Sequence, residues 1–245
     1  RLRRRKRRCH VGLPEGHPMS CPGAILVVAK APVPGLAKTR LTPRFGQGGA
    51  AELAAAALLD TLEAVEAAHA SERIVALTGE LGMARRSEEI REMLARFTVV
   101  PQRGHGLGQR LAAAHADAAA LARAPVLQIG MDTPQVSGPM LSAAVQQLAD
   151  CVPGAVLGPA TDGGWWALGV SDPEWAVALE GVPMSGPDTG SLTRASLDNL
   201  GVRVGELPEL RDVDTAEDVW LVAEAVGVGS RFRVAVDRLR SASAA

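Results

Sequence analysis

Short apolar runs alternate with longer helical segments along most of this chain, and this alternation limits the possible folds more than any other feature. The first run, residues 24–29, is continuously apolar and leads into a loop rich in proline and glycine. Such a run is typical of a strand buried on both faces of a parallel sheet. Strands are predicted at residues 24–29, 74–78, 97–100, 126–129 and 155–157, with helices between them at 49–70, 87–96, 107–123 and 139–149. This order predicts a Rossmann-like α/β fold, with helices on both faces of a mostly parallel sheet.

The pattern changes after residue 158. Residues 165–170 are predicted as a strand reached through a glycine-rich turn, and a helix, a strand and a helix are predicted beyond it at 188–200, 202–207 and 215–226. A break of this kind is typical of a mixed sheet that includes an antiparallel strand. We therefore expect a mixed, mostly parallel sheet, in a body whose length fits one α/β domain or two small ones.

Charge is unevenly distributed along the chain. The formal net charge is -1, but seven of the 26 basic residues and one of the 27 acidic residues lie in the first 18 positions, so residues 19–245 carry a net charge of -7. We expect residues 1–23 to form a disordered basic N-terminal extension and residues 24–245 to form the folded domain. Met19 is a candidate translation start within that extension.

Composition argues against several classes of protein. Aromatic residues make up 3% of the chain and tyrosine is absent, which disfavours the stacking surfaces of single-stranded nucleic-acid binders. No apolar run approaches the roughly 18 residues of a membrane span. Three widely spaced cysteines without a Cys-x-x-Cys pair disfavour a disulfide framework or a structural zinc site. We predict a cytoplasmic protein whose folded body crosses no membrane and binds no nucleic acid.

The loop that follows the first strand carries three cations in eleven residues, together with two prolines and a glycine. Proline stiffens a loop and glycine allows its backbone to approach a ligand closely. Clustered cations and backbone N–H groups at a strand end favour phosphate binding, and the alternative is a solvated basic loop. The residues predicted to bind a nucleotide here are Lys30, Pro32, Gly35, Lys38, Thr39 and Arg40.

Asp132 follows the predicted strand 126–129 directly. Ligands of parallel α/β sheets bind at the carboxyl ends of the strands, so a carboxylate there is well placed to hold Mg²⁺ or Mn²⁺. The alternative is an Asp that caps the turn before Thr133 and Pro134. The neighbouring phosphate loop favours the metal interpretation.

A tight turn at Asp162, Gly163 and Gly164 precedes two tryptophans. In the functional interpretation this turn lies against a sugar or another substrate and Trp165 stacks on it, while Asp162 contacts the hydroxyl groups of the substrate or provides a second metal position. In the structural interpretation the segment is a hairpin turn followed by tryptophans, of which alternation lets one face inward.

A loop with two further carboxylates, Asp212 and Asp214, precedes the last predicted helix. Thr215 and Asp218 are explained by capping of that helix. The two carboxylates of the loop are not, and one of them would complete a two-carboxylate metal site with Asp132.

Two glycine-rich loops give weaker signals, at residues 102–110 and 184–190. The first includes Gln102 and Arg110, which we add to the predicted nucleotide-binding residues. No Gly-x-Ser-x-Gly elbow accompanies them, so a serine hydrolase triad has no local support.

Four segments in this order resemble one bacterial family, described as glycosyltransferase-A-like or nucleotide-diphospho-sugar-transferase-like and sometimes named for radical-SAM or selenodomain-associated neighbours. The resemblance extends over residues 24–226. It departs from the usual pattern at Met131, where a small residue is common, and at Trp165-Trp166, where a tyrosine pair is common. The segments that carry it are Lys30-Ala31-Pro32 with residues 35–41, residues 130–134, residues 158–164, and Asp212-Val213-Asp214-Thr215.

This resemblance implies a single-domain Rossmann-like GT-A fold. Three of the segments are more distantly similar to guanylyltransferases that activate phospholactate or phosphoenolpyruvate, and to molybdenum-cofactor and sugar nucleotidyltransferases. By that similarity, Lys38 and Arg40 would face the nucleotide phosphates, while Asp132 and Asp214 would hold the metal.

Three functions follow as hypotheses. The first is metal-dependent glycosyl transfer from a nucleotide-diphospho-sugar to a small-molecule or lipid acceptor. Its catalytic residues would be Lys38, Arg40 and Asp162, and its substrate residues would be Asp162, Gly163, Gly164 and Trp165. The second is nucleotidyl transfer with release of pyrophosphate from a nucleoside triphosphate. The third is a non-catalytic nucleotide-binding or RNA-associated protein that uses the arginine-rich end as an electrostatic arm.

Overall fold

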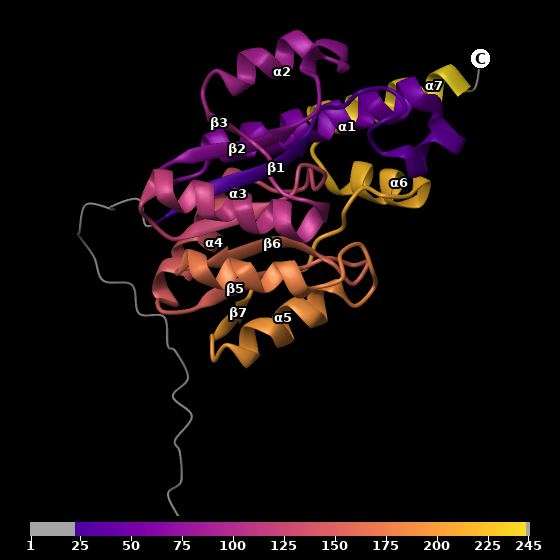
Figure 1. Cartoon of the computed structure of the whole chain (residues 1–245). Coiled ribbons are helices and arrows are strands. Elements are labelled where there is room, and N and C mark those ends of the chain that lie inside the picture. The colour runs from indigo at the N-terminus through magenta and orange to yellow at the C-terminus, as the bar shows by residue number, and fades with distance from the viewer. Residues whose placement is uncertain (1–22, 244–245) are drawn as a thin grey trace, which may run out of the picture.

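The computed structural model describes residues 23–243, so all but one residue of the predicted basic extension lies outside the described part of the chain (Figure 1). Within residues 23–243, seven strands form one sheet in the order β3-β2-β1-β4-β6-β5-β7. Their bounds are β1 Ala24–Lys30, β2 Arg73–Thr78, β3 Thr98–Pro101, β4 Val126–Ile129, β5 Ala155–Pro159, β6 Trp165–Val170 and β7 Val204–Glu206.

The sheet is parallel except at one strand. β1 lies between β2 and β4, with Val27 opposite Val75 on one side and Ile129 on the other. β6 runs antiparallel to both β4 and β5, whereas β7 is parallel to β5. The predicted mixed, mostly parallel sheet is therefore confirmed, including the antiparallel strand after the glycine-rich turn.

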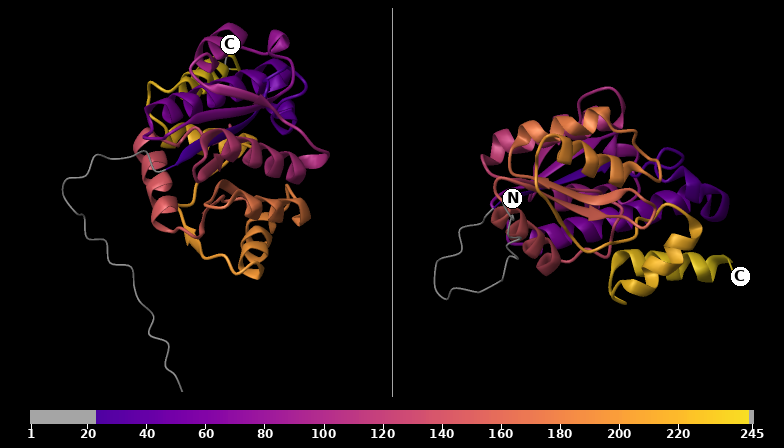
Figure 2. Two further views of the ribbon diagram at one scale, coloured as in Figure 1. Left: turned by 60° about the vertical axis from the view of Figure 1, so that its left-hand side comes forward. Right: turned by 90° about the horizontal axis from the view of Figure 1, so that it is seen from below.

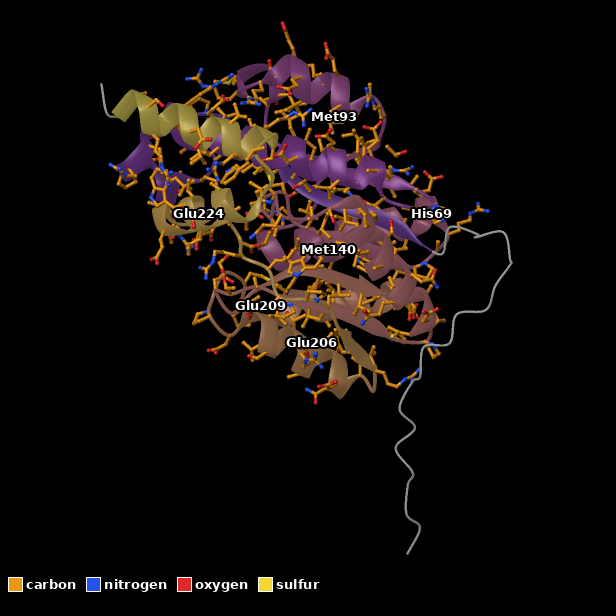
Figure 3. All side chains as sticks on the ribbon, turned by 180° about the vertical axis from the view of Figure 1, so that it is seen from behind. His69, Met93, Met140, Glu206, Glu209 and Glu224 are labelled. Carbon is orange, nitrogen blue, oxygen red and sulfur yellow. The ribbon has the colours of Figure 1, made fainter. Side chains whose placement is uncertain are left out.

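Helices cover both faces of the sheet, as predicted (Figure 2). One face packs against α1, α2 and α4, and the other against α3, the 3₁₀ helix η3 and α5. Figure 3 shows the first of these faces, with Met140 of α4 labelled on it. The helix bounds are α1 Thr42–Ala67, α2 Ser87–Leu94, α3 Gly106–Ala122, α4 Gly138–Asp150, α5 Thr189–Asn199, α6 Ala216–Ala225 and α7 Arg231–Ser243, with 3₁₀ turns η1 Thr39–Leu41, η2 Leu81–Met83 and η3 Pro173–Gly181.

α1 is the central helix of its layer, and its alanines explain how it fits there. Small side chains let neighbouring backbones come close: a Cβ on Gly138 of α4 would lie 2.9 Å from the Cβ of Ala67. One side of α1 packs against the sheet through Leu58 and Leu62, and the other packs against α6 and α7. Most of α1 between Ala50 and Val65 is buried, as expected of a helical segment that is apolar on most of its surface.

Two features of this layer differ from the sequence prediction. α1 begins at Thr42 and continues through a kink at Gly46, whose φ is 67°, whereas a helix was predicted from residue 49. α7 was not predicted, although its apolar residues Phe232, Ala235, Val236 and Leu239 have the i, i+3, i+4, i+7 spacing of an amphipathic helix. The Asp60 carboxylate of α1 accepts hydrogen bonds from the N–H groups of Arg231 and Phe232, each at 2.9 Å, and so caps α7 from a distance.

Within residues 23–243, none of the helices combines the length and the apolar composition that crossing a bilayer requires.

Candidate nucleotide site

A cavity of about 490 Å³ opens at the carboxyl ends of β1 and β4. The chain leaves β1 toward β2 on one side, and β4 lies on the other, so the connections after these strands diverge and leave a crevice. Crevices at this switch point are where open α/β sheets bind their ligands, and the volume suits a small molecule.

Lys38 lies at the centre of the polar wall of this cavity. Its Nζ is 2.5 Å from Asp132 Oδ2 and 2.6 Å from Asp214 Oδ1, so one ammonium bridges two carboxylates. Its side chain is 14% exposed. Burial lowers the pKa of Lys38, but the charges of Asp132 and Asp214 outweigh burial and hold the pKa well above its usual value. Lys38 is therefore a cation at any physiological pH.

The proline-rich loop fixes the backbone from which Lys38 extends. The Pro32 carbonyl accepts a hydrogen bond from Arg85 N–H at 3.0 Å, and Gly35 turns the chain with φ 78°. Lys30 Nζ donates to the Leu36 carbonyl at 2.7 Å, which braces the loop. The residues that marked this loop in the sequence therefore have two roles: Lys30, Pro32 and Gly35 shape the loop, and Lys38 faces the carboxylates.

Arg40 approaches the same cluster from the outside. Its guanidinium donates to Asp214 Oδ2 at 3.1 Å, and its side chain is 66% exposed. A second cation therefore stands at the cavity mouth without filling the point between the carboxylates.

Two distant segments meet to bring the carboxylates together. Val213 N–H donates to the Asp132 carbonyl at 3.0 Å, and the Thr133 hydroxyl donates to Asp212 Oδ1 at 2.8 Å. These bonds tie the loop after β4 to the loop before α6. The predicted capping role of Thr215 is confirmed, since it forms a capping box with Asp218.

Asp212 differs in charge from its neighbours. Burial, reinforced by the negative charge of Asp132, raises the pKa of Asp212 to about 8. At neutral pH it is therefore mostly protonated, which limits repulsion within this group of acids.

The turn at residues 162–164 is held by packing against the loop before α5. A Cβ on Gly163, where φ is 87°, would lie 1.8 Å from the Pro187 carbonyl oxygen, and Gly190 N–H donates to the Gly163 carbonyl at 2.8 Å. Asp162 Oδ1 accepts the Gly164 N–H at 2.8 Å. Gly163 is thus required by the fold of the turn, and Asp162 and Gly164 line the cavity beside it.

The two tryptophans separate as alternation predicts. Trp166 is buried and its Nε1 donates to the Pro208 carbonyl at 2.9 Å. Trp165 is partly exposed, lines the cavity, and donates to Thr193 Oγ1 at 3.2 Å.

Leu107 and Leu111 of α3 line the part of the cavity next to this helix, together with Gln102 and Gln128. Gln102 is oriented by two hydrogen bonds from its amide nitrogen, to the Ala29 carbonyl at 2.8 Å and the Ala76 carbonyl at 2.9 Å. Gln128 lies on the floor against buried His115 of α3, whose pKa burial lowers to about 4 while Gln128 opposes this shift in part.

Most of the predicted site residues line this one cavity: Lys30, Lys38, Thr39, Arg40, Gln102, Arg110, Asp132, Asp162, Gly164, Trp165 and Asp214. Pro32, Gly35 and Gly163 do not line it and shape the adjoining loops instead.

Sequence reasoning did not assign several other lining residues. Met131 accepts a hydrogen bond from the Lys30 N–H through its sulfur at 3.1 Å. In the sequence, Met131 departs from the family pattern, in which a small residue is common at this position. Met184 and Ser185 come from the second glycine-rich loop, where Ser185 has a left-handed φ of 65°. The remaining unassigned lining residues include Thr78, Leu107, Leu111 and Gln128, which carry no distinctive local signal. Asp212, one of the two carboxylates considered for the metal site, lines the cavity as well.

Asp132 and Asp214 could hold a divalent cation, but Lys38 occupies the point between them. Asp132 and Asp214 direct one oxygen each at a common point, and Mg²⁺ typically uses one or two protein carboxylates together with substrate phosphates. Within the described residues, no cluster of three or more His, Cys, Asp or Glu could hold a metal ion. The two carboxylates therefore fit Mg²⁺ or Mn²⁺, provided that Lys38 leaves the point between them.

The fold and its crevice define an α/β protein with the nucleotide-diphospho-sugar transferase fold. Residues 61–186 match the model of DUF2064, described as uncharacterized proteins conserved in bacteria, and the chain belongs to this family. Comparison with curated proteins gave no match.

Solved structures support the fold assignment. A protein from Desulfovibrio desulfuricans G20, assigned provisionally as a nucleotide-diphospho-sugar transferase, is 23% identical with a TM-score of 0.77, over 91% of this chain and 96% of that one. The 4-diphosphocytidyl-2C-methyl-D-erythritol synthase of Anaerococcus prevotii DSM 20548 is 12% identical with a TM-score of 0.52, over 82% and 94%. Rv0371c of Mycobacterium tuberculosis H37Rv in complex with manganese is 20% identical with a TM-score of 0.51, over 83% and 100%.

Proposed function

We propose that this protein is a metal-dependent transferase that binds a nucleotide-diphospho-sugar and transfers its sugar to an acceptor. The observation that carries the proposal is the convergence of Lys38, Asp132 and Asp214 at the switch-point cavity. Cations and paired carboxylates at one point suit a diphosphate, because the carboxylates can hold a divalent ion and the cations can contact phosphate oxygens directly. We assign this activity to the domain expected from residue 24 onward.

Glycosyl transfer requires the protein to stabilise the negative charge that develops on the leaving diphosphate. When the bond between the sugar and the diphosphate breaks, its electron pair stays with the diphosphate, and preorganised positive charge there stabilises the transition state. Lys38 and Arg40 are in reach of that position. A divalent ion held by Asp132 and Asp214 would supply further Lewis-acid stabilisation of the diphosphate.

The acceptor side of the cavity carries Asp162 and Trp165. Asp162 uses Oδ1 to hold its own turn, which leaves Oδ2 to receive the proton that an attacking hydroxyl releases. Trp165 offers an indole face against which a sugar ring can lie.

Nucleotidyl transfer is the second candidate, because Lys38 and Arg40 together also suit a triphosphate that loses pyrophosphate. In that reaction the acceptor attacks the α-phosphorus, and the same cations would stabilise pyrophosphate as it leaves. Product analysis separates the two reactions: pyrophosphate released from a nucleoside triphosphate indicates nucleotidyl transfer, and a nucleoside diphosphate released from a nucleotide-sugar indicates glycosyl transfer.

A thermal-shift panel of nucleotides and nucleotide-sugars, with and without Mg²⁺ or Mn²⁺, tests the site. We expect a metal-dependent rise in melting temperature for at least one nucleotide-sugar, and its loss in Asp132→Asn. Asp150→Asn is the matched control, since Asp150 lies at the end of α4 and accepts a bond from Gln146. Absence of any stabilisation across the donor panel with either metal would rule the proposal out.

A further inference from the structure

We propose that Lys38 is a placeholder for the divalent cation: it fills the cation position until a diphosphate draws it away, so that the metal and the diphosphate bind together. This inference rests on the proposed function and adds an order of events to it. A divalent ion alone would find its position taken, and a diphosphate would both attract Lys38 and free the two carboxylates.

The geometry leaves no room for two cations at this point. The Lys38 Nζ lies within 2.6 Å of one oxygen from each of Asp132 and Asp214. A magnesium ion held by these oxygens would need distances of about 2.0–2.1 Å and would coincide with the ammonium. The carboxylate side chains are 28% and 32% exposed, against 14% for Lys38, so they are accessible to a cation once the lysine moves.

The Lys38 side chain can move without disturbing its backbone. The backbone is fixed in the left-handed region, with φ 45° and ψ 48°, and its carbonyl accepts the Leu41 N–H at 2.9 Å. The four-carbon stem of lysine has several rotatable bonds and carries a compact charge. Rotation of the stem would exchange the contact with carboxylates for a contact with phosphate oxygens.

Arg40 gives a matched comparison, because it contacts the same cluster without occupying the cation position. It reaches Asp214 through the other oxygen, Oδ2, and is 66% exposed. If general positive charge repelled the metal, removing either cation would help the metal to bind. If occupancy of the position matters, removing Lys38 will help much more.

The first experiment measures Mn²⁺ binding in the absence of nucleotide, by electron paramagnetic resonance of free Mn²⁺. We expect Lys38→Met to bind Mn²⁺ about 10-fold or more tightly than the parent protein, within the usual range of coupling between sites. Arg40→Met should change the affinity less than about 3-fold. The double variant Lys38→Met/Asp132→Asn should lose the added affinity. Equal Mn²⁺ affinity in the parent protein and in Lys38→Met would overturn the inference.

The second experiment observes Lys38 directly. The chain contains three lysines, at positions 6, 30 and 38, so ¹⁵N-lysine labelling gives a simple side-chain spectrum, which Lys38→Met assigns. We expect Mg²⁺ alone to leave the Lys38 Nζ resonance unchanged, and Mg²⁺ with the best-binding of ADP, CDP, GDP and UDP to shift it. A shift with Mg²⁺ alone, or no shift when both are bound, would contradict the inference.

Failure of this inference differs from failure of the proposed function. If a nucleotide-sugar binds with metal but Lys38→Met has no effect on Mn²⁺ affinity, the function stands and the placeholder role is wrong. If Lys38→Met binds Mn²⁺ tightly but no nucleotide-sugar binds, the placeholder role stands for the cation position and the donor assignment is wrong.

Discussion

Two acidic clusters contact basic side chains, but their hydrogen-bond partners differ. The cavity cluster consists of Asp132 and Asp214 around Lys38. The cluster under α7 consists of Asp60, Glu63 and Glu89 around Arg231. Asp60 accepts two backbone N–H groups of α7, which cannot leave without unfolding that helix end. Asp132 and Asp214 share one lysine side chain, which can rotate away. A carboxylate held by backbone groups serves the fold, whereas a carboxylate held by a movable side chain remains available to a ligand.

The largest expected effect is a loss of transfer activity when a carboxylate of the cavity cluster is removed. Asp214→Asn should lower transfer activity about 100-fold or more, because it removes one of the two carboxylates proposed to hold the divalent ion that stabilises the leaving diphosphate. The melting temperature should change little, since no backbone group depends on the side chain. Steady-state rates with a saturating metal and donor, beside a thermal melt, check both parts. Unchanged activity would remove Asp214 from the proposed machinery.

Removal of the Asp60 carboxylate under α7 should have the opposite effect: stability should fall, and the function of the cavity should be unchanged. Asp60→Ala should lower the free energy of unfolding by about 2–3 kcal/mol, because it leaves two N–H groups and Arg231 without their buried acceptor. Nucleotide affinity should stay the same. Urea unfolding measures the loss, with Asp60→Asn as a milder control that keeps one acceptor oxygen. If the free energy of unfolding of Asp60→Ala falls by less than about 0.5 kcal/mol, Asp60 contributes no more to stability than the cavity carboxylates do, and the contrast between the two clusters is wrong.

A smaller effect is expected at the turn beside the acceptor part of the cavity. Gly163→Ala should cost about 1–3 kcal/mol, because its Cβ would lie 1.8 Å from the Pro187 carbonyl and its φ is left-handed. Gly227→Ala is the control, since nothing lies within 4 Å of the Cβ it would add. Chemical unfolding of both variants compares them, and equal stability would show that the loop before α5 shifts freely.

Asp212 adds a dependence on pH to the cavity cluster. Its pKa is about 8 in the folded protein and near 3.8 in the unfolded chain, so between these values the folded state keeps a proton that the unfolded chain has released. Unfolding free energy should therefore fall as pH rises toward 8, by at most about 1.4 kcal/mol per pH unit.

The window from pH 6.5 to 8 isolates this effect from His115, whose titration lies lower, between about 4 and 6.5. Urea unfolding in metal-free buffer across the window should show the decline in the parent protein, and Asp212→Asn should lack it. Parallel curves for the two proteins would mean that Asp212 is ionised in the folded state.

The smallest effect is expected at the rim of the cavity cluster. Arg40→Met should weaken nucleotide binding only a few-fold, since its contact with Asp214 is largely exposed to solvent. Calorimetric titration of the best nucleotide checks this. Lys38→Met, measured beside it, should lose more nucleotide affinity, because Lys38 lies between the two carboxylates. Equal losses in the two variants would mean that the two cations act alike.

Sequence patterns predicted the strands well because a buried parallel strand is marked by its own residues. The run 24–29 and the acid after the strand 126–129 are local signals, and strand topology alone brings their ends together. That reasoning places Lys38 and Asp132 at one edge of the sheet, whereas the choice of Asp214 over Asp212 came from the family resemblance.

The features that sequence reasoning missed depend on distant contacts. Packing against Pro187 explains Gly163, and neither residue marks the other in the sequence. The protonation of Asp212 depends on burial and on Asp132, which lies in another loop. α7 holds its place through Asp60, 171 residues from Arg231. A sequence pattern read in short windows contains none of these relations.

The capping of α7 by Asp60 also bears on how the chain folds during synthesis. α1 is made early, but one side of it, with Leu53 and Ala57, is covered by Val219 of α6 and Phe232 of α7. A ribosome that has made α1 must add well over a hundred residues before that covering exists. During this interval the nascent helix presents an apolar flank, so a chain released early would be a natural target for chaperones and proteases.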